Sequence, residues 1–292
     1  YNLKGFIKIL KITFFILFLL ATLNTCKDKE KESFVNYNSL EKIHKRGKLI
    51  AVMDFNSTNY FIYRGEPMGY QYELLQLLAE HLGVKLEVIV ENNVDKNFEM
   101  LEKGKCDIIA INLTITKERS KVIDFTYPHS QTHQVLVQRK PNNWSKLYKE
   151  EIEENLIRNQ LDLAGKLVYV QKGTSYAQRI KNLSDEIGDS IIIIEKGDKE
   201  VEELIELVAS GEIDYTVADE NVALVNQIYY PNLDVKTAVS FPQNMAWGLK
   251  KGDNQLKKEI DKWLKEFTGS KQYSVIYNKY FKNPLFLQIL GS

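Results

Sequence analysis

One pattern occurs twice in the chain, and it limits the possible folds more than any other feature. Each copy has a helical stretch, a glycine, two further residues, an aspartate and an apolar run rich in β-branched residues, at residues 100–110 and 207–218. The fifth residue past the aspartate is polar in both copies, Asn112 in the first and Asp219 in the second. Gly-x-x-Asp is by itself a common turn into a strand, so the repeat gains its weight from the residues that come after each copy.

The first copy lies within a longer alternation of strand and helix patterns. The apolar runs 49–53 and 86–90 have strand character, and leucines at helical spacing between them end at Gly83. This order predicts a β-α-β unit in an open α/β sheet, where ligands bind at the carboxyl ends of the strands. Two such lobes facing each other would enclose a cleft.

The N-terminal segment has the features of an export signal. Three lysines precede the uncharged run 12–25, whose apolar core is shorter than the roughly 20 residues that span a bilayer. Cys26 follows this run, and the charged stretch 27–32 comes next. This resembles a bacterial lipoprotein signal in which Cys26 is acylated, although Asn24 and Thr25 stand where small residues are usual. An uncleaved anchor and a cleaved soluble export signal are the alternatives.

The charge balance and the cysteines exclude several classes of function. The chain has 39 Lys+Arg and 39 Asp+Glu, so no net field attracts nucleic acid. Without residues 1–25, which hold three lysines and no acids, the balance is 36 to 39, or −3. The sequence has no Cys-x-x-Cys or His-Glu-x-x-His spacing, and Cys106 lies in an apolar run as a small core residue. No metal and no other cofactor is expected.

The residues after the first repeat carry a specific motif. A Thr-x-Thr-x-Glu-Arg turn at 114–119 runs into Val-x-Asp-Phe-Thr-x-Pro at 122–128. This motif resembles that of the amino-acid-type periplasmic solute-binding proteins, the bacterial extracellular solute-binding protein family 3. The resemblance implies that Arg119 binds the α-carboxylate of the ligand and that Thr114 assists. A planar guanidinium offers paired donors that suit a carboxylate. An arginine at the surface, paired with Glu118 or Asp124, is the alternative.

The resemblance assigns the opposite side of the cleft as well. In the stretch 165–175, Thr174 and Ser175 would meet the same carboxylate at a helix N-terminus, a role that capping by Ser175 does not prevent. Asp219 falls where the family places the carboxylate that binds the α-ammonium group, and a plain helix N-cap is its alternative.

Side-chain recognition is assigned to the first lobe. Asp54 and Tyr60 fall where the family has groups that contact the ligand side chain, and the ring of Tyr60 would stack on it. Phe61 is one residue away in the alignment, and we expect it to pack in the core. Asn112 completes the predicted ligand-binding set.

The resemblance covers about residues 40–281 and implies an α/β fold with two lobes, the type II periplasmic-binding-protein fold, joined by two hinge strands near 129–133 and 238–241. The implied parts are a signal peptide (1–26), a tether (27–38), lobe 1 (39–130 and 241–283), lobe 2 (131–240) and a tail (284–292).

Within this range the stretches 69–75, 212–219 and 244–248 most resemble the non-catalytic sensor half of the membrane-bound lytic transglycosylase F family. No peptidoglycan-cleaving domain is expected in these 292 residues, so the chain is expected to be a stand-alone receptor or a truncated member of that family. Its expected partners are an amino acid or muropeptide-like ligand and either an ABC permease or a murein-cleaving domain. We expect a monomer that faces the periplasm and is held by lipid at the membrane, the outer one by preference.

Two other classes stay open at this point. The cleft could itself be catalytic, as in the cyclic-acid dehydratases that resemble this fold, with Glu73 or Glu220 as general acid. The chain could also be a scaffold that binds no ligand.

Overall fold

The computed structural model describes residues 38–283. The predicted signal peptide with Cys26, nearly all of the predicted tether and the tail 284–292 lie outside the described residues. Within residues 38–283, no helix has both the length and the apolar character needed to cross a bilayer.

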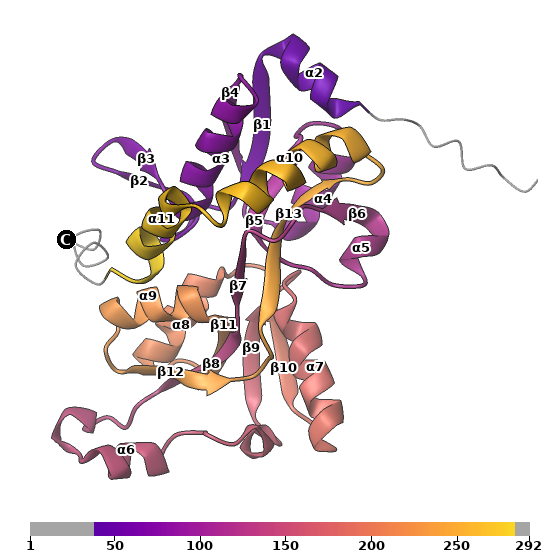
Figure 1. Ribbon diagram of the computed structural model, residues 1–292. Helices are drawn as coiled ribbons and strands as arrows, with labels where there is room; N and C mark the ends of the chain where they lie inside the picture. The colour runs from indigo at the N-terminus through magenta and orange to yellow at the C-terminus, as the bar shows by residue number, and fades with distance from the viewer. Residues whose placement is uncertain (1–37, 284–292) are drawn as a thin grey trace, which may run out of the picture. The chain divides into compact units, whose positions relative to one another are not determined.

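The first lobe is built on a six-stranded sheet, at the top of Figure 1. Its strands are β1 (Lys48–Met53), β4 (Lys85–Val90), β5 (Ile108–Thr114), β6 (Ile123–Phe125), β7 (Ser130–Thr132) and β13 (Gln243–Lys250). β1 pairs in parallel with β4 and β5, whereas β13 runs antiparallel to β5, β6 and β7. The predicted strand patterns at 49–53 and 86–90 are thus confirmed as neighbours.

Helices cover both faces of this sheet. Successive strand residues point to opposite faces, so Met53 packs with one group of helices while Val52 packs with the other. The helices on the Met53 face are α2 (Ser39–Arg46), α3 (Tyr70–His81), α10 (Asn254–Phe267) and α11 (Lys271–Phe281). The Val52 face is covered by α4 (Val94–Glu102), and the short α5 (Arg119–Val122) leads directly into β6. A small hairpin of β2 (Phe61–Tyr63) and β3 (Glu66–Met68) lies beside α3. Cys106 is buried on the Val52 face, where burial raises the pKa of its thiol to about 12, as expected of a core cysteine.

The second lobe repeats this three-layer arrangement on five strands, in the order β10-β9-β11-β8-β12. Its elements are β8 (Gln134–Arg139), η1 (Trp144–Lys146), α6 (Lys149–Glu154), η2 (Gln160–Leu163), β9 (Leu167–Gln171), α7 (Tyr176–Ile187), β10 (Ile192–Lys196), α8 (Val201–Ser210), β11 (Tyr215–Asp219), α9 (Glu220–Tyr229) and β12 (Leu233–Ala238). Leu136 packs with α7 on one face, and Val137 packs with α8 and α9 on the other.

The repeated pattern of the sequence has the same structure in both lobes. In the first copy α4 leads through Gly104 and Asp107 into β5, and in the second α8 leads through Gly211 and Asp214 into β11. β5 and β11 each lie in the interior of their sheet. The prediction of two related α/β lobes is confirmed.

The chain crosses between the sheets twice, in the middle of Figure 1. The first crossing passes through His133 between β7 and β8, and the second passes through residues 239–242 between β12 and β13. At the first-lobe end of the crossings, Thr132 of β7 pairs with Gln243 of β13. The two connections therefore start side by side.

A partly buried ion pair holds the far edge of the second sheet. Arg158 binds Asp234 of β12 with Nη1 to Oδ1 at 2.5 Å and Nη2 to Oδ2 at 2.9 Å. Burial raises the pKa of Asp234, but Arg158 more than offsets this and the net shift is downward. Asp234 therefore adds stability above the ordinary pKa of an aspartate, and this stability is lost as the pH falls through its lowered pKa.

We expect Arg158→Met to lower the free energy of unfolding by about 3 kcal/mol, because the buried Asp234 carboxylate loses its cation. Urea denaturation at pH 7 measures this. The double variant Arg158→Met, Asp234→Asn is the control and should recover part of the loss. A single variant that loses less than about 1 kcal/mol, the range of a surface pair, would contradict the assignment.

Candidate functional site

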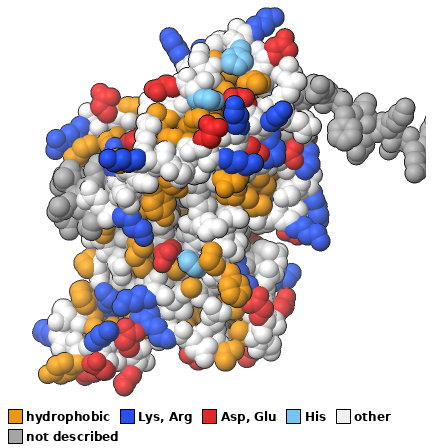
Figure 2. All heavy atoms as spheres, in the orientation of Figure 1, with side chains coloured by type: hydrophobic (Ala, Val, Ile, Leu, Met, Phe, Trp, Pro, Cys, Tyr) orange, Lys and Arg blue, Asp and Glu red, His pale blue; other side chains and the backbone are white. Residues whose placement is uncertain are grey.

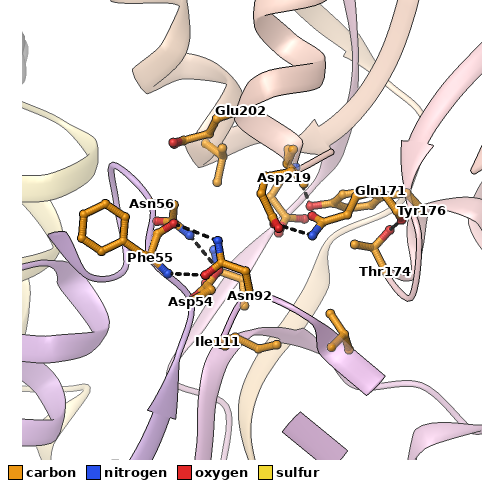
Figure 3. Close-up of a pocket in the computed structure, with 15 residues that line it drawn as sticks. Asp54, Phe55, Asn56, Asn92, Ile111, Gln171, Thr174, Tyr176, Glu202 and Asp219 are labelled. Carbon is orange, nitrogen blue, oxygen red and sulfur yellow. Dashed lines mark hydrogen bonds between the residues drawn. The ribbon is translucent and has the colours of Figure 1, made fainter. Parts of the chain in front are cut away.

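A cavity of about 90 Å³ lies between the two lobes, and Figure 3 shows its lining. We call it the acidic cavity, because four carboxylates line it. The first lobe contributes Asp54, Phe55, Asn56, Asn92, Val94, Ile111 and Asn112, and the second contributes Gln171, Thr174, Tyr176, Glu200, Val201, Glu202, Asp219 and Val222.

Asp219 ends strand β11 and points into this cavity. The residue is 2% exposed, and its Oδ1 atom has no hydrogen-bond partner among the described residues. It occupies the N-cap position of α9 but makes no capping bond, so the alternative of a plain N-cap does not describe its side chain. Burial raises its pKa to about 7, although Tyr176 and Arg119 act in the opposite direction. Buried polar atoms nearly always have partners, so the free oxygen indicates a missing donor.

Asp54 follows strand β1 on the opposite lobe. Asn59 donates to it from Nδ2 at 2.9 and 3.0 Å, and Asn56 donates at 2.7 Å. Desolvation raises its pKa to about 7; Asn59 lowers the pKa, while Glu202 and Glu200 add to the rise. The side chains that donate to this carboxylate are therefore neutral amides.

The loop that follows Asp54 depends on an asparagine turn and on one glycine. Asn56 Oδ1 accepts from the backbone N–H groups of Thr58 at 2.9 Å and Asn59 at 2.7 Å, which forms an Asx turn. Gly69 packs against this loop with φ 136°, and a Cβ built there would lie 2.1 Å from the carbonyl oxygen of Asn59. Only glycine lets the backbone come this close.

Two glutamates at the N-terminus of α8 complete the acidic cavity. Glu202 accepts from the Ser57 backbone N–H, 3.3 Å from either carboxylate oxygen, and from the Ser57 hydroxyl, so it links the lobes directly. Glu200 accepts from Gln171 Nε2 at 2.5 Å, and burial raises its pKa. No Lys, Arg or His of residues 38–283 lines this cavity.

Arg119 lies in a neighbouring, more open cavity of about 440 Å³, which also has residues of both lobes in its lining. Its Nη1 donates to the Thr114 carbonyl and its Nη2 to the Gly173 carbonyl, each at 3.1 Å. Among the described residues it forms no ion pair with Glu118 or Asp124, because Asp124 binds Lys251 instead. The alternative of a surface ion pair is therefore not what the structure shows.

The hydroxyl groups predicted for the site meet beside Arg119. Ser175 Oγ donates to Thr114 Oγ1 at 3.2 Å and accepts from Gln134 Nε2 at 2.9 Å, and it makes no bond that caps α7. Thr174 lines both cavities, and its hydroxyl donates to the Gln171 carbonyl at 2.7 Å. Thr174 thus marks the boundary between them.

The predicted site residues are divided between the two cavities. Asp54, Asn112 and Asp219 line the acidic cavity, while Thr114, Arg119 and Ser175 line the other. Arg119 and Asp219 are close enough to shift each other's pKa.

Tyr60 lines neither of these two cavities. Its ring packs on Phe55 and Tyr72 with centroids 6.2 and 5.4 Å apart, and Phe55 lines the acidic cavity in its place. Phe55, Gln171, Glu200 and Glu202 were missed by sequence reasoning. The acidic start of the helical stretch after residue 198 is the one signal for the glutamates.

Neither glutamate considered as a general acid lines the acidic cavity. Glu73 accepts from Lys279 Nζ and from the Tyr280 hydroxyl, each at 2.5 Å. Glu220 is half-buried, and its Oε2 lies 3.6 Å from His133 Nδ1. No group of three metal-binding side chains occurs within residues 38–283. The two cavities between the lobes are therefore suited to binding the charged groups of a small ligand.

Two sandwiched α/β lobes, two crossings and cavities between the lobes define a type II periplasmic binding-protein fold. Residues 49–283 match the family of bacterial extracellular solute-binding proteins, family 3. The chain therefore belongs to this family.

Solved structures of amino-acid-binding proteins have the same fold. One is an ancestral amino-acid-binding protein described as a precursor of cyclohexadienyl dehydratase, with a TM-score of 0.70 and 28% sequence identity. The match covers 84% of this chain and 100% of the ancestral protein. An ancestral arginine-binding protein bound to arginine has a TM-score of 0.68 at 27% identity and covers 81% of this chain and 99% of its own.

The curated relatives are longer proteins. Membrane-bound lytic murein transglycosylase F of Desulfosudis oleivorans is 35% identical over 243 residues, which is 83% of this chain and 50% of that protein. The protein of the same name from Saccharophagus degradans is 32% identical over 232 residues, which is 78% of this chain and 43% of that protein. The chain thus spans about half the length of the curated relatives it matches.

Proposed function

We propose that this chain is a ligand-binding domain whose lobes close on an α-amino acid or a small ligand that contains one. The observation that carries the proposal is the buried Oδ1 of Asp219, which has no hydrogen-bond partner within residues 38–283 and lies close to Arg119 of the opposite lobe. An α-ammonium group would supply the missing donor, and the adjacent guanidinium would bind the α-carboxylate.

Arg119 is already oriented for this role. It spans the lobes through the carbonyl groups of Thr114 and Gly173, which are neutral acceptors. A carboxylate that takes their place adds a negative charge on the acceptor side and can accept two parallel N–H bonds from the guanidinium. The hydroxyls of Thr114, Thr174 and Ser175 surround the same space as further donors. A ligand that contacts both lobes favours the closed form by its difference in affinity for the two states.

The comparisons support the ligand class and leave two roles for the domain. The solute-binding family and the amino-acid-binding structures favour a receptor, and we propose an ABC permease as its partner in this role. The transglycosylase relatives, matched over half their length, favour a sensor joined to a murein-cleaving domain. Either role places the chain in the cell envelope, and we propose attachment through lipid on Cys26. Reading the gene beyond the codon for Ser292 distinguishes the two roles.

The test is a thermal-shift and calorimetry screen of the purified chain against the L-α-amino acids. A ligand at one hundred times its dissociation constant is expected to stabilise the chain by about 2.7 kcal/mol. Matched compounds that lack the α-ammonium or the α-carboxylate group are the controls and should not stabilise it. If no amino acid or amino-acid-containing fragment shifts the melting temperature, the proposal fails.

Binding is also expected to release protons near neutral pH. Burial raises the pKa values of Asp54 and Asp219 to about 7 in the unliganded protein, so both are partly protonated there. A bound ammonium favours the ionised form and lowers the pKa of Asp219. Affinity should therefore increase as the pH rises from 6 to 8. Calorimetry at pH 7 in two buffers with different ionisation enthalpies measures the released protons, and equal binding enthalpies would contradict this.

A further inference from the structure

We propose that the acidic cavity selects ligands with a second positive charge, and that this charge allows the lobes to close. The inference rests on the proposed function and names the ligand class for the same site. It is carried by Asp54, Glu200 and Glu202, which reach the cavity from opposite lobes.

A ligand that carries only an α-ammonium and an α-carboxylate group would not neutralise the carboxylates of the cavity. Its lining holds four carboxylates and no cationic side chain among the described residues. In the proposed binding mode the α-ammonium group pairs with Asp219 and the α-carboxylate with Arg119. Asp54, Glu200 and Glu202 then have no counter-charge, and one cationic group on the ligand side chain would meet all three.

The side chains that donate to these three carboxylates are neutral. Asp54 accepts from Asn56 and Asn59, and Glu200 accepts from Gln171. Glu202 accepts from Ser57, and also from Asn226 Nδ2 at 3.4 Å. These bonds satisfy oxygen atoms but supply no positive charge, and an ionised carboxylate held away from water requires a partner of opposite sign.

The positions of the carboxylates connect ligand charge with closure. Asp54 belongs to the first lobe, whereas both glutamates lie at the start of α8 in the second, as Figure 3 shows for Asp54 and Glu202. Closing the lobes without a ligand brings like charges together, and repulsion opposes it. A cation between the lobes is attracted from both sides, so it favours the closed form.

Phe55 provides a surface for such a cation. Phe55 lines the acidic cavity next to Asp54 and is 49% exposed, so its ring is open to a ligand at the edge of the cavity. Ammonium and guanidinium groups bind favourably over an aromatic face. The ligand class is therefore an α-amino acid with an ammonium or guanidinium group at the end of its side chain.

Calorimetry of the full chain with L-arginine and L-citrulline tests the inference, because the two have nearly the same shape and citrulline lacks the side-chain charge. We expect arginine to bind about 30-fold more tightly or better. Small-angle X-ray scattering should show a smaller radius of gyration with saturating arginine than with citrulline at the same concentration.

Single variants identify the groups responsible. Glu202→Gln and Glu200→Gln keep size and hydrogen-bonding capacity, and each should reduce the arginine-to-citrulline affinity ratio severalfold. Glu206→Gln is the matched control, because Glu206 is exposed on the same helix, does not line the acidic cavity, and should leave the ratio unchanged.

The outcomes separate this inference from the proposed function. If citrulline binds as tightly as arginine, or if both cavity variants leave the ratio unchanged, the second-charge inference is wrong while amino-acid binding stands. If no amino acid binds at all, both fail.

Discussion

Arg119→Ala is expected to weaken binding of L-arginine, or of any α-amino acid that the chain binds, by roughly a hundredfold or more. Two charge-assisted bonds from the guanidinium to the α-carboxylate contribute about 3 kcal/mol or more together, and 1.4 kcal/mol is a factor of ten. The variant should remain folded, because the guanidinium bonds only the carbonyl groups of Thr114 and Gly173, and Arg119 belongs to none of the apolar clusters of the two lobes. Calorimetry measures the affinity, and circular dichroism verifies the fold.

Two further variants give this result its specificity. Arg119→Lys keeps the charge but loses the paired donors, so an intermediate affinity is expected. Arg179 lines the same cavity but binds Glu186 at 2.7 and 2.8 Å, so Arg179→Ala should leave affinity nearly unchanged. Unchanged affinity in Arg119→Ala would remove this residue from the site.

Gly69→Ala is expected to lower the free energy of unfolding by about 3 kcal/mol or more. Its φ of 136° and ψ of 154° lie in a region open essentially to glycine alone, and the new Cβ would overlap the Asn59 carbonyl. Because Asn59 holds Asp54, affinity for L-arginine should fall as well. Urea denaturation measures the stability.

Gly83→Ala is the matched control for this substitution. Gly83 also has a positive φ, 68°, but a Cβ there would meet no atom within 4 Å. Gly83→Ala should lower the free energy of unfolding by only about 1 kcal/mol, the usual penalty for alanine in place of glycine in the left-handed region. If both variants lose the same amount, close packing against Asn59 is not the reason that position 69 is glycine.

The sequence was sufficient for the fold because the fold depends on local periodicity. The leucines between residues 74 and 82 predicted a helix, and α3 extends from Tyr70 to His81. The repeat predicted β5 and β11 because a helix, a turn and a strand succeed one another within a dozen residues. Strand β1 packs against helices on both of its faces, through Val52 on one and Met53 on the other, and a run of residues that are all apolar is typical of such a strand.

The site could be predicted only in part, because it depends on contacts between distant residues. The family motif indicated Arg119 and Asp219, but their separation into neighbouring cavities results from how the lobes meet. Ser57 and Glu202 are 145 positions apart and touch only in the folded protein. The choice between Tyr60 and Phe55 depended on the direction of side chains in an irregular loop, where no periodicity applies.

The paired crossings of the chain have a mechanical consequence. Two connections that start beside each other resist twisting far more than a single one, so we expect any relative movement of the lobes to be mainly a bending about one axis. Two dyes attached to opposite lobes would then report occupancy as a single change in distance. The protein is thereby suited to an optical sensor, because its signal would not depend on which protein receives the ligand-bound form.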